Sequence, residues 1–332
     1  MSRNAGWLLM GLACVLFALA LGLRFLPGGV SIWTMAVYPV ASQVWVPMTE
    51  LGAVPWTPVL AGALSLLVGW LLHTASSRGA RLAIIASVPL LIWSTFMLGW
   101  GLHAWREPLE ARLGLEPQTG VAAGSLTANQ AQALANALER IITDSAPSGE
   151  FELEAAHASV VDSVAVFAPM VRLPIRVKLV PGWLFGSLGV AGVVSPWTLE
   201  VHVDRGLPSW SQAAVAAHEW AHLAGFATEA GAEVVGLVAG LRADHPHARY
   251  AAALRAWSSL PPEVRAVDAL PERAQLDLTA ARLASERQVP WLSSVGWGVY
   301  EQFLRSQGQP EGLSGYGLGV VLLYQTWRAG SW

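Results

Sequence analysis

The sequence has little charge, a single cysteine and a single lysine. Asp, Glu, Lys and Arg make up 13% of its 332 residues, whereas about 25% is usual in soluble domains. The formal net charge is −3 and basic residues form no cluster, which argues against a nucleic-acid partner. Cys14 has no second cysteine in the chain, so an intrachain disulfide framework is excluded. The apolar content of 54% excludes a disordered chain.

The apolar excess is concentrated in the first third of the chain. Three uncharged runs lie at 6–23, 51–72 and 82–102, and each has about the length needed to cross the hydrocarbon core of a bilayer. We therefore expect three transmembrane helices within a membrane anchor at 1–106. The first run resembles a signal peptide, but it extends past its cleavage-like Ala18-Leu19-Ala20, which favours an uncleaved anchor.

The segment 28–49 is also uncharged, but it contains glycine, proline and polar residues. We expect an interfacial or re-entrant helix there, with a fourth span as the alternative. Arg3, Arg78 and Arg81 lie in short segments that the positive-inside rule assigns to the cytoplasm. The rest of the chain is then expected on the extracytoplasmic side of the membrane.

Residues 107–332 have the mixed polar and apolar pattern of a water-exposed domain. Helical periodicity predicts helices at about 125–144 and 151–169, and strand-like alternation follows between 173 and 203. After Pro208 the pattern is helical to the end. We therefore expect an α+β fold that is mostly helical and has a small sheet.

The clearest chemical signal is the pattern His218-Glu219-Trp-Ala-His222. Two histidines four residues apart lie on one face of a helix, where their Nε2 atoms can bind one Zn2+ ion. Glu219 then lies beside the ion and is expected to take a proton from a zinc-bound water. The alternative is a pair of ordinary surface or core histidines.

A catalytic zinc site needs a third protein ligand. Gly225 is expected to end the helix and turn the chain, so that a second helix with Glu229 and Glu233 returns toward the metal. We prefer Glu229 as the ligand because it follows the turn closely, and we keep Glu233 as the alternative.

The alternating residues 198–204 precede the histidine helix. We expect them to form an edge strand that pairs with an extended peptide substrate, as edge strands do in peptide recognition. Thr198, Glu200 and His202 lie on one face of this strand, and Glu200 or His202 is expected to face the cleft. A solvated strand face is an equally weighted alternative.

Other polar residues are weaker candidates. Tyr250, Tyr300 and Tyr316 are candidates for stabilising an oxyanion. Tyr316 is slightly preferred, because it lies in a glycine-containing stretch. His245 and His247 flank a proline and are expected to be loop residues without a metal.

Four motifs in order along the chain carry a family resemblance. Trp100-Gly-Leu-His-Ala-Trp-Arg-Glu-Pro-Leu is similar to W-G-L-N-Y-x-R-x-P-L, and Ser195-Pro-Trp-Thr-Leu-Glu200-Val to P-F-T-x-E-A. His218 to Glu229 resembles H-E-x-A-H-x-x-G-[FIY]-x-x-E, and Tyr300 to Tyr316 resembles Y-L-x-x-x-G-Q-x-D-G-V-x-S-Y. The chain therefore resembles a family of bacterial membrane proteins, the domain of unknown function 3810.

The resemblance implies a membrane-anchored, gluzincin-like zinc peptidase with a zincin-like domain at 107–332. It places Glu229 on the glutamate position of the family and implies a location in the bacterial cytoplasmic membrane. The family pattern continues E-D-E-A-N, whereas this chain has Ala230 and Gly231 in place of the two acids that follow and an acid at Glu233. His103 replaces the asparagine of the family.

The sequence thus predicts a membrane-anchored zinc metallopeptidase that hydrolyses peptide or protein substrates through a water activated by Glu219. The alternative is a non-catalytic, zinc-stabilised binding or scaffold protein of the cell envelope. The partners expected in both cases are Zn2+ and the lipid bilayer.

Overall fold

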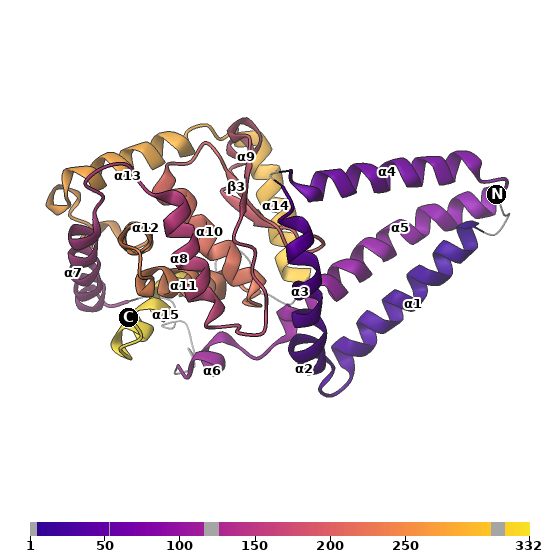
Figure 1. Ribbon diagram of the computed structural model, residues 1–332, viewed down its shortest axis with the longest axis horizontal. Coiled ribbons are helices and arrows are strands. Elements are labelled where there is room, and N and C mark those ends of the chain that lie inside the picture. The colour runs from indigo at the N-terminus through magenta and orange to yellow at the C-terminus, as the bar shows by residue number, and fades with distance from the viewer. Residues whose placement is uncertain (1–4, 53, 116–125, 307–315) are drawn as a thin grey trace. The chain divides into compact units, whose positions relative to one another are not determined.

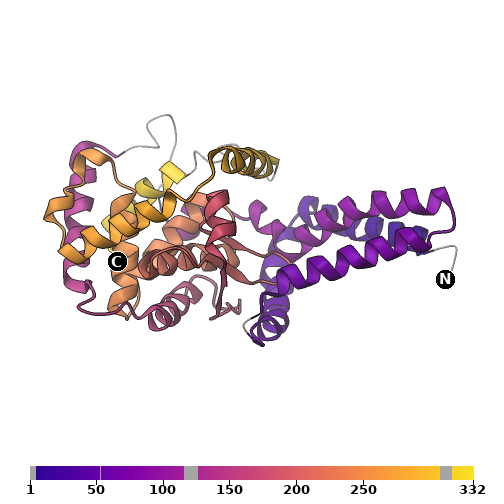
Figure 2. The same cartoon turned by 90° about the horizontal axis from the view of Figure 1, so that it is seen from above.

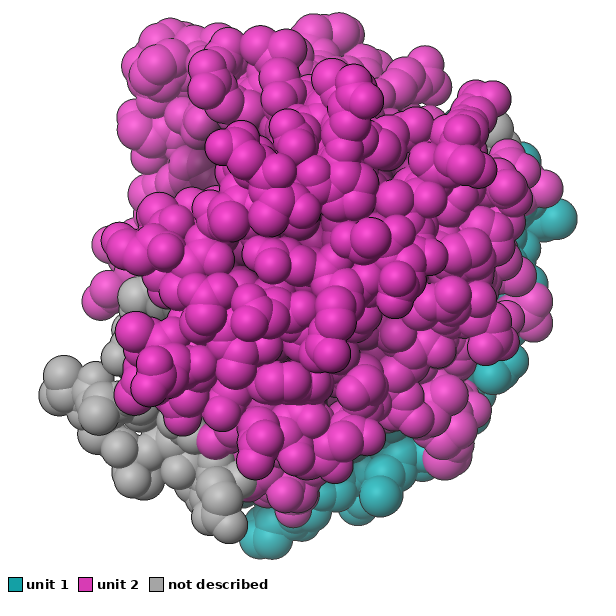
Figure 3. Space-filling view, turned by 90° about the vertical axis from the view of Figure 1, so that its left-hand side faces the viewer, with its two compact units in different colours: residues 1–106, 195–200 teal, residues 107–194, 201–332 magenta. Residues whose placement is uncertain are grey.

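The computed structural model of the protein describes residues 5–52, 54–115, 126–306 and 316–332. The chain divides into two compact units, which Figure 3 distinguishes by colour. Unit 1 comprises residues 1–106 together with 195–200, and unit 2 comprises 107–194 and 201–332. The short segment 195–200 therefore belongs to unit 1, although the residues on both sides of it belong to unit 2.

Unit 1 contains three helices that are long and apolar enough to cross a membrane, as expected from the sequence. These helices are α1 (Ala5–Phe25), α4 (Trp56–Thr74) and α5 (Arg78–Gly99). The second helix begins later than expected because Pro55 precedes it in an extended conformation. The third begins earlier because the Ser77 hydroxyl caps it and accepts a hydrogen bond from the backbone N–H of Ala80 at 3.1 Å. Their orientation across a membrane stays a prediction.

Helices α1 and α5 run side by side in both ribbon views (Figures 1 and 2). The Phe17 ring lies 4.9 Å from the Trp93 ring, and Gly6 approaches the backbone of Ala80 so closely that a Cβ atom at residue 6 would lie 2.5 Å from its carbonyl oxygen. This pair of helices is therefore held together by close backbone packing and aromatic contact.

The segment 28–49 is helical but not one continuous α-helix. It consists of α2 (Gly29–Ile32), the π-helical η1 (Trp33–Val37) and α3 (Tyr38–Thr49), and the 3-10 segment η2 (Gly101–Trp105) follows α5. The Trp33 indole N–H donates to the Leu98 carbonyl at 3.0 Å. None of these elements is among the candidate spans, and the expected interfacial or re-entrant position stays a prediction.

Glu200 lies in unit 1 and caps the first turn of α4. Its carboxylate accepts hydrogen bonds from the backbone N–H groups of Trp56 at 2.9 Å and Thr57 at 3.0 Å. The hydroxyls of Thr57 and Thr198 also donate to it, at 2.9 and 3.0 Å. Glu200 is only 1% exposed. The expectation that Glu200 faces a substrate cleft is therefore wrong, because the unpaired N–H groups at a helix start bind this carboxylate instead.

Unit 2 is mostly helical with a small sheet, as the sequence predicts. Its longer helices are α7 (Ala128–Ser145), α8 (Leu153–Ala165), α10 (Ser209–Leu223), α11 (Glu229–Arg242), α12 (Pro246–Ser258), α13 (Glu272–Ser285), α14 (Pro290–Ser306) and α15 (Tyr316–Arg328). Its shorter ones are α6 (Leu109–Leu113), α9 (Gly182–Leu188), η4 (Pro262–Val264) and η5 (Val267–Ala269). Helix α11 is central: it packs against α8, α10, α12 and α15 (Figure 1), and every residue in it except Arg242 is buried.

The sheet has three strands, β1 (Val177–Val180), β2 (Gly192–Val194) and β3 (Val201–Asp204), in the order β1-β3-β2. Strand β3 pairs in parallel with β1 and antiparallel with β2. The expectation of an edge strand over 198–204 is wrong, because β3 is paired on both sides and His202 is buried in it. The strand starts only at Val201, since Leu199 has a left-handed φ of 54° that interrupts the extended backbone.

We expect Glu200→Ala to destabilise the protein, because it leaves the N–H groups at the start of α4 without their buried acceptor. A loss of about 2–3 kcal/mol is typical of such a charged acceptor. The thermal unfolding midpoint of the full chain in detergent should fall for Glu200→Ala and fall less for Glu200→Gln, which keeps one acceptor oxygen. Glu263→Ala, at an exposed position, is the control. Equal midpoints for Glu200→Ala and the control would contradict the capping role.

Candidate metal centre

Helix α10 carries His218, Glu219 and His222, and it ends where Gly225 turns the chain. Gly225 has a φ of 88°, a conformation that costs glycine little and other residues more. The N–H of Gly225 donates to the His222 carbonyl at 2.9 Å, and the N–H of Phe226 donates to that of Ala221 at 3.1 Å. These bonds close the helix end, so the sequence prediction of a turn at Gly225 is confirmed.

Arg112 of α6 holds this turn from outside. Its guanidinium donates to the Gly225 carbonyl at 3.0 Å and lies 3.7 Å from the centre of the Phe226 ring. The contact combines a hydrogen bond with a cation–π interaction. Arg112 thereby stabilises the turn that carries the Phe226 carbonyl, which lies 2.9 Å from His222 Nδ1.

Helix α11 begins at Glu229, after Thr228, whose hydroxyl accepts from the N–H of Gly231 at 3.1 Å. It packs closely on α10 at Gly236, where an added Cβ atom would lie 2.8 Å from the backbone nitrogen of His218. Only a residue without a side chain fits at this point. The close approach brings the first turn of α11 opposite the two histidines.

His218, His222 and Glu229 form a cluster whose ligand atoms all lie within 4.8 Å of one another. His218 Nε2 lies 3.3 Å from Glu229 Oε2, and His222 Nε2 lies 3.7 Å from Glu229 Oε1. All three side chains are largely buried, with exposed fractions of 13%, 10% and 3%. Two imidazole nitrogens and one carboxylate are a donor set typical of a zinc site that keeps a position for substrate or water.

The hydrogen bonds of the two imidazoles suit metal binding. His218 Nδ1 lies 3.1 Å from Glu233 Oε2, and His222 Nδ1 lies 2.9 Å from the Phe226 carbonyl oxygen. Because both partners only accept, each Nδ1 carries the hydrogen. Each Nε2 can then present its lone pair to a cation next to Glu229, as in metal sites whose histidines are oriented by a carboxylate or a carbonyl.

The charges of the cluster favour a cation at its centre. Burial lowers the pKa of His218, but Glu229 and Glu233 outweigh this effect and raise the pKa to about 10. Burial raises the pKa of the Glu229 carboxyl, but the two imidazoles outweigh it and hold that pKa well below its usual range. The carboxylates therefore hold a positive charge on His218, and a divalent cation fits in place of the proton on Nε2.

Glu233, the alternative ligand, lies on the Nδ1 side of His218 and is not part of the three-residue cluster. Its other oxygen accepts from Arg255 Nε at 2.9 Å. Burial raises the pKa of the Glu233 carboxyl, but Arg255 and His218 outweigh it and hold that pKa well below its usual range. The geometry therefore favours Glu229 over Glu233 as a candidate ligand, and the ligand assignment stays a prediction.

Glu219 is buried next to this cluster, with 6% exposure. Strand β2 lies against it: a Cβ atom added at Gly192 would lie 2.8 Å from Glu219 Oε1. Burial is the main cause that raises the pKa of the Glu219 carboxyl, against the opposing effect of the two histidines. A raised pKa suits a carboxylate that takes up a proton and gives it away again.

The three candidate tyrosines have different positions. The Tyr300 hydroxyl of α14 donates a hydrogen bond to Glu229 Oε1. The Tyr250 hydroxyl instead donates to Asp277 Oδ2 at 2.7 Å, away from the cluster. Tyr316 begins α15, but its side chain lies outside the described part of the chain. Residue spacing alone did not favour Tyr300 over the other tyrosines and did not point to Arg255.

Glu152, His245 and His247 form a second group with close ligand atoms. Here both Nδ1 atoms accept hydrogen bonds from backbone N–H groups: His247 from Glu152 at 2.9 Å, and His245 from His247 at 3.3 Å. A neutral imidazole that accepts through Nδ1 carries its hydrogen on Nε2, and His245 Nε2 lies 3.4 Å from the Glu152 carboxylate. This group connects the starts of α8 and α12 and is poorly suited to a metal.

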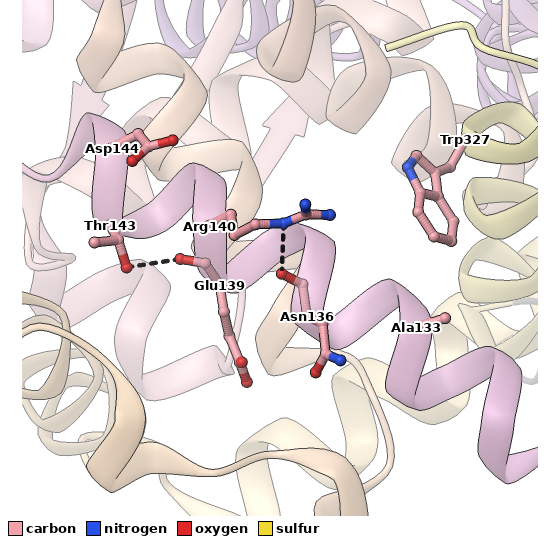
Figure 4. A pocket seen from close by; sticks show the side chains of 7 residues that line it. All are labelled: Ala133, Asn136, Glu139, Arg140, Thr143, Asp144 and Trp327. Atoms are coloured by element: carbon pink, nitrogen blue, oxygen red, sulfur yellow. Dashed lines mark hydrogen bonds between the residues drawn. The ribbon is translucent and has the colours of Figure 1, made fainter.

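Two surface hollows do not include the cluster. One of about 680 Å3 is lined by polar side chains of α7 and by Trp327 of α15 (Figure 4), where Arg140 and Thr143 donate to carbonyls of their own helix. The other, of about 350 Å3, borders Glu233 and Arg255. Neither is lined by His218, His222 or Glu229. The second hollow therefore reaches Glu233, which contacts His218, but its lining does not include the three residues of the cluster.

A family model described as "Protein of unknown function (DUF3810)" matches residues 34–324. No significant match is found among curated proteins or among solved structures.

We expect the purified full chain to retain about one zinc ion after dialysis. His218→Ala, His222→Ala and Glu229→Ala should each lose it, since each removes one of three ligands. His245→Ala and His247→Ala should keep it. Metal analysis by mass spectrometry measures this. Zinc retained in His218→Ala, or lost in His245→Ala, would show that the ion is bound elsewhere.

Glu233→Gln should keep the zinc stoichiometry but weaken zinc affinity about 10–100-fold, the usual effect of altering a group that orients a ligand. The reason is that an amide binds His218 Nδ1 and Arg255 less strongly than a carboxylate. Competition with a chelator of known affinity measures the change, with Glu263→Gln as the surface control. Complete loss of zinc, as in Glu229→Ala, would instead make Glu233 a ligand.

Proposed function

The chain belongs to the DUF3810 family, and we propose that it is a membrane-anchored, zinc-dependent metallopeptidase with a zincin-like domain of the gluzincin kind. The observation that carries the proposal is the buried cluster of His218, His222 and Glu229 with Glu219 beside it. Peptides or proteins are its substrates. Unit 2 acts on the extracytoplasmic side of the bacterial cytoplasmic membrane.

His218, His222 and Glu229 hold the zinc ion in this proposal. When bound there, zinc supplies Lewis acidity that polarises a substrate carbonyl and makes water more acidic. Glu233 and the Phe226 carbonyl keep the hydrogens of both imidazoles on Nδ1. The Tyr300 hydroxyl binds one oxygen of Glu229 and leaves Oε2, which faces His218 Nε2, for the ion.

Glu219 is the general base and then the general acid. It accepts a proton from the attacking water as the C–O bond forms, and it donates that proton to the leaving amine as the C–N bond breaks. Its burial raises its pKa and thus its readiness to hold a proton between these two steps. The carboxylate ends the cycle deprotonated, so no further reactant is needed.

In this proposal, strand β2 is the edge strand that pairs with an extended peptide substrate, in place of residues 198–204. It lies at one edge of the sheet and next to Glu219, through Gly192. An extended substrate that pairs with β2 would add a strand to this edge. Its peptide bonds would then run close to the carboxylate of Glu219.

A non-catalytic zinc-stabilised module is the second candidate. It is favoured by the strong burial of the three residues His218, His222 and Glu229. The buried Glu219 with its raised pKa favours the enzyme, because a purely structural site has no use for such a group.

Glu219→Gln should retain zinc and lose about 10²–10⁴-fold in cleavage rate, the usual contribution of a general base. Glutamine has nearly the same shape but takes up no proton. Cleavage of a fluorescent casein substrate by the full chain in detergent measures the rate, and Glu263→Gln is the matched control. A Glu219→Gln variant as active as the parent would rule out this mechanism. A zinc-loaded parent that cleaves nothing would favour the non-catalytic module.

A further inference from the structure

Helix α14 of unit 2 has two faces of different character. On its inner face, Ser293 is buried, Trp297 is half-buried, and Tyr300 reaches Glu229. These residues are spaced four and three positions apart, so they lie on one side of the helix. This face attaches α14 to the remainder of unit 2 beside the candidate metal centre.

The outer face is apolar and exposed. Trp291, Val295 and Val299 follow one another at intervals of four residues, with exposed fractions of 69%, 59% and 66%. Helix α9, which packs against α14 (Figure 1), exposes Trp183 to 76%. Single exposed apolar residues are ordinary, but three aligned along one helix form a continuous apolar stripe whose burial away from water is favourable.

The composition of this stripe suits a lipid surface. The stripe itself carries no charge, and the exposed Arg305 of the same helix is paired with Glu301 at 2.7 Å. A helix with tryptophan and aliphatic residues along one face is typical of helices that lie in the membrane interface. Tryptophan in particular prefers the region of the lipid headgroups.

The candidate membrane spans are connected to unit 2 by only a short segment of the chain. The chain contains three such spans, and unit 2 follows the last of them, which ends at Gly99, after a few residues. Such a short connection keeps the effective concentration of the membrane surface high. Weak binding by one apolar stripe is then sufficient.

We propose that α14 lies on the bilayer surface, with Trp291, Val295 and Val299 at the boundary between headgroups and acyl chains. The opposite face of the same helix holds Tyr300 against Glu229. The membrane contact therefore supports the helix that positions a candidate metal ligand. The contact itself does not depend on whether the protein is a peptidase.

The single cysteine makes a direct test practical. In a Cys14→Ser background, a cysteine is introduced by Val295→Cys and labelled with bimane, and the full chain is placed in nanodiscs of phosphatidylcholine and phosphatidylglycerol. Leu283→Cys on α13, an exposed apolar position at 57%, is the matched control. Some nanodiscs contain lipid with a doxyl quencher near the headgroup.

We expect doxyl lipid to quench the label at residue 295 strongly and the label at residue 283 little. Equal quenching at both positions would overturn the proposal. A label at residue 295 that is shielded from water but not quenched by doxyl lipid would also overturn it, because a second copy of the chain would then cover the stripe. Circular dichroism and zinc content of each variant check that it is folded.

Discussion

The close packing of α11 on α10 is the constraint on which the rest of the site depends. Helix α11 is buried along almost its whole length, yet it carries two glutamates. A buried carboxylate is costly unless it is paired, and each of these has partners: Glu229 has both imidazoles and the Tyr300 hydroxyl, while Glu233 has His218 and Arg255. Gly236 permits the approach that makes these pairs. The structure thus holds two negative charges around an imidazole pair, an arrangement that favours a cation.

Other buried acids of this chain are also paired with hydrogen-bond donors. Glu200 binds the start of α4 through four donors, and Asp204 at the end of β3 pairs with Arg287 at 3.0 Å. Both buried acids thus have donors, which are mainly backbone N–H and hydroxyl groups for Glu200 and the Arg287 guanidinium for Asp204. Glu219 is distinguished from them because its pKa is raised, whereas that of Glu229 is lowered. In the proposed enzyme, these opposite shifts fit a proton carrier at Glu219 and a metal ligand at Glu229.

Local patterns predicted the features that depend on local geometry. The three apolar helices, the helix through His218 and His222, and the turn at Gly225 all follow from residue spacing and from glycine chemistry. Contacts between distant residues were not predictable. Arg255 lies 22 residues from Glu233, and Tyr300 lies 71 residues from Glu229. The alternation of residues 198–204 did not indicate that β3 is paired on both sides or that Glu200 caps α4. An alternating pattern predicts which side chains share a face of a strand, but it does not predict which elements lie next to that strand.

Zinc K-edge X-ray absorption on the full chain in detergent tests the assignment of the metal centre most directly. We predict a spectrum with two imidazole ligands and one carboxylate, with metal–ligand distances of about 2.0–2.2 Å. Glu229→Gln should change the oxygen contribution and leave both imidazoles in place. A spectrum with fewer than two imidazoles, or one that Glu229→Gln leaves unchanged, would contradict the assignment of His218, His222 and Glu229 as the metal centre.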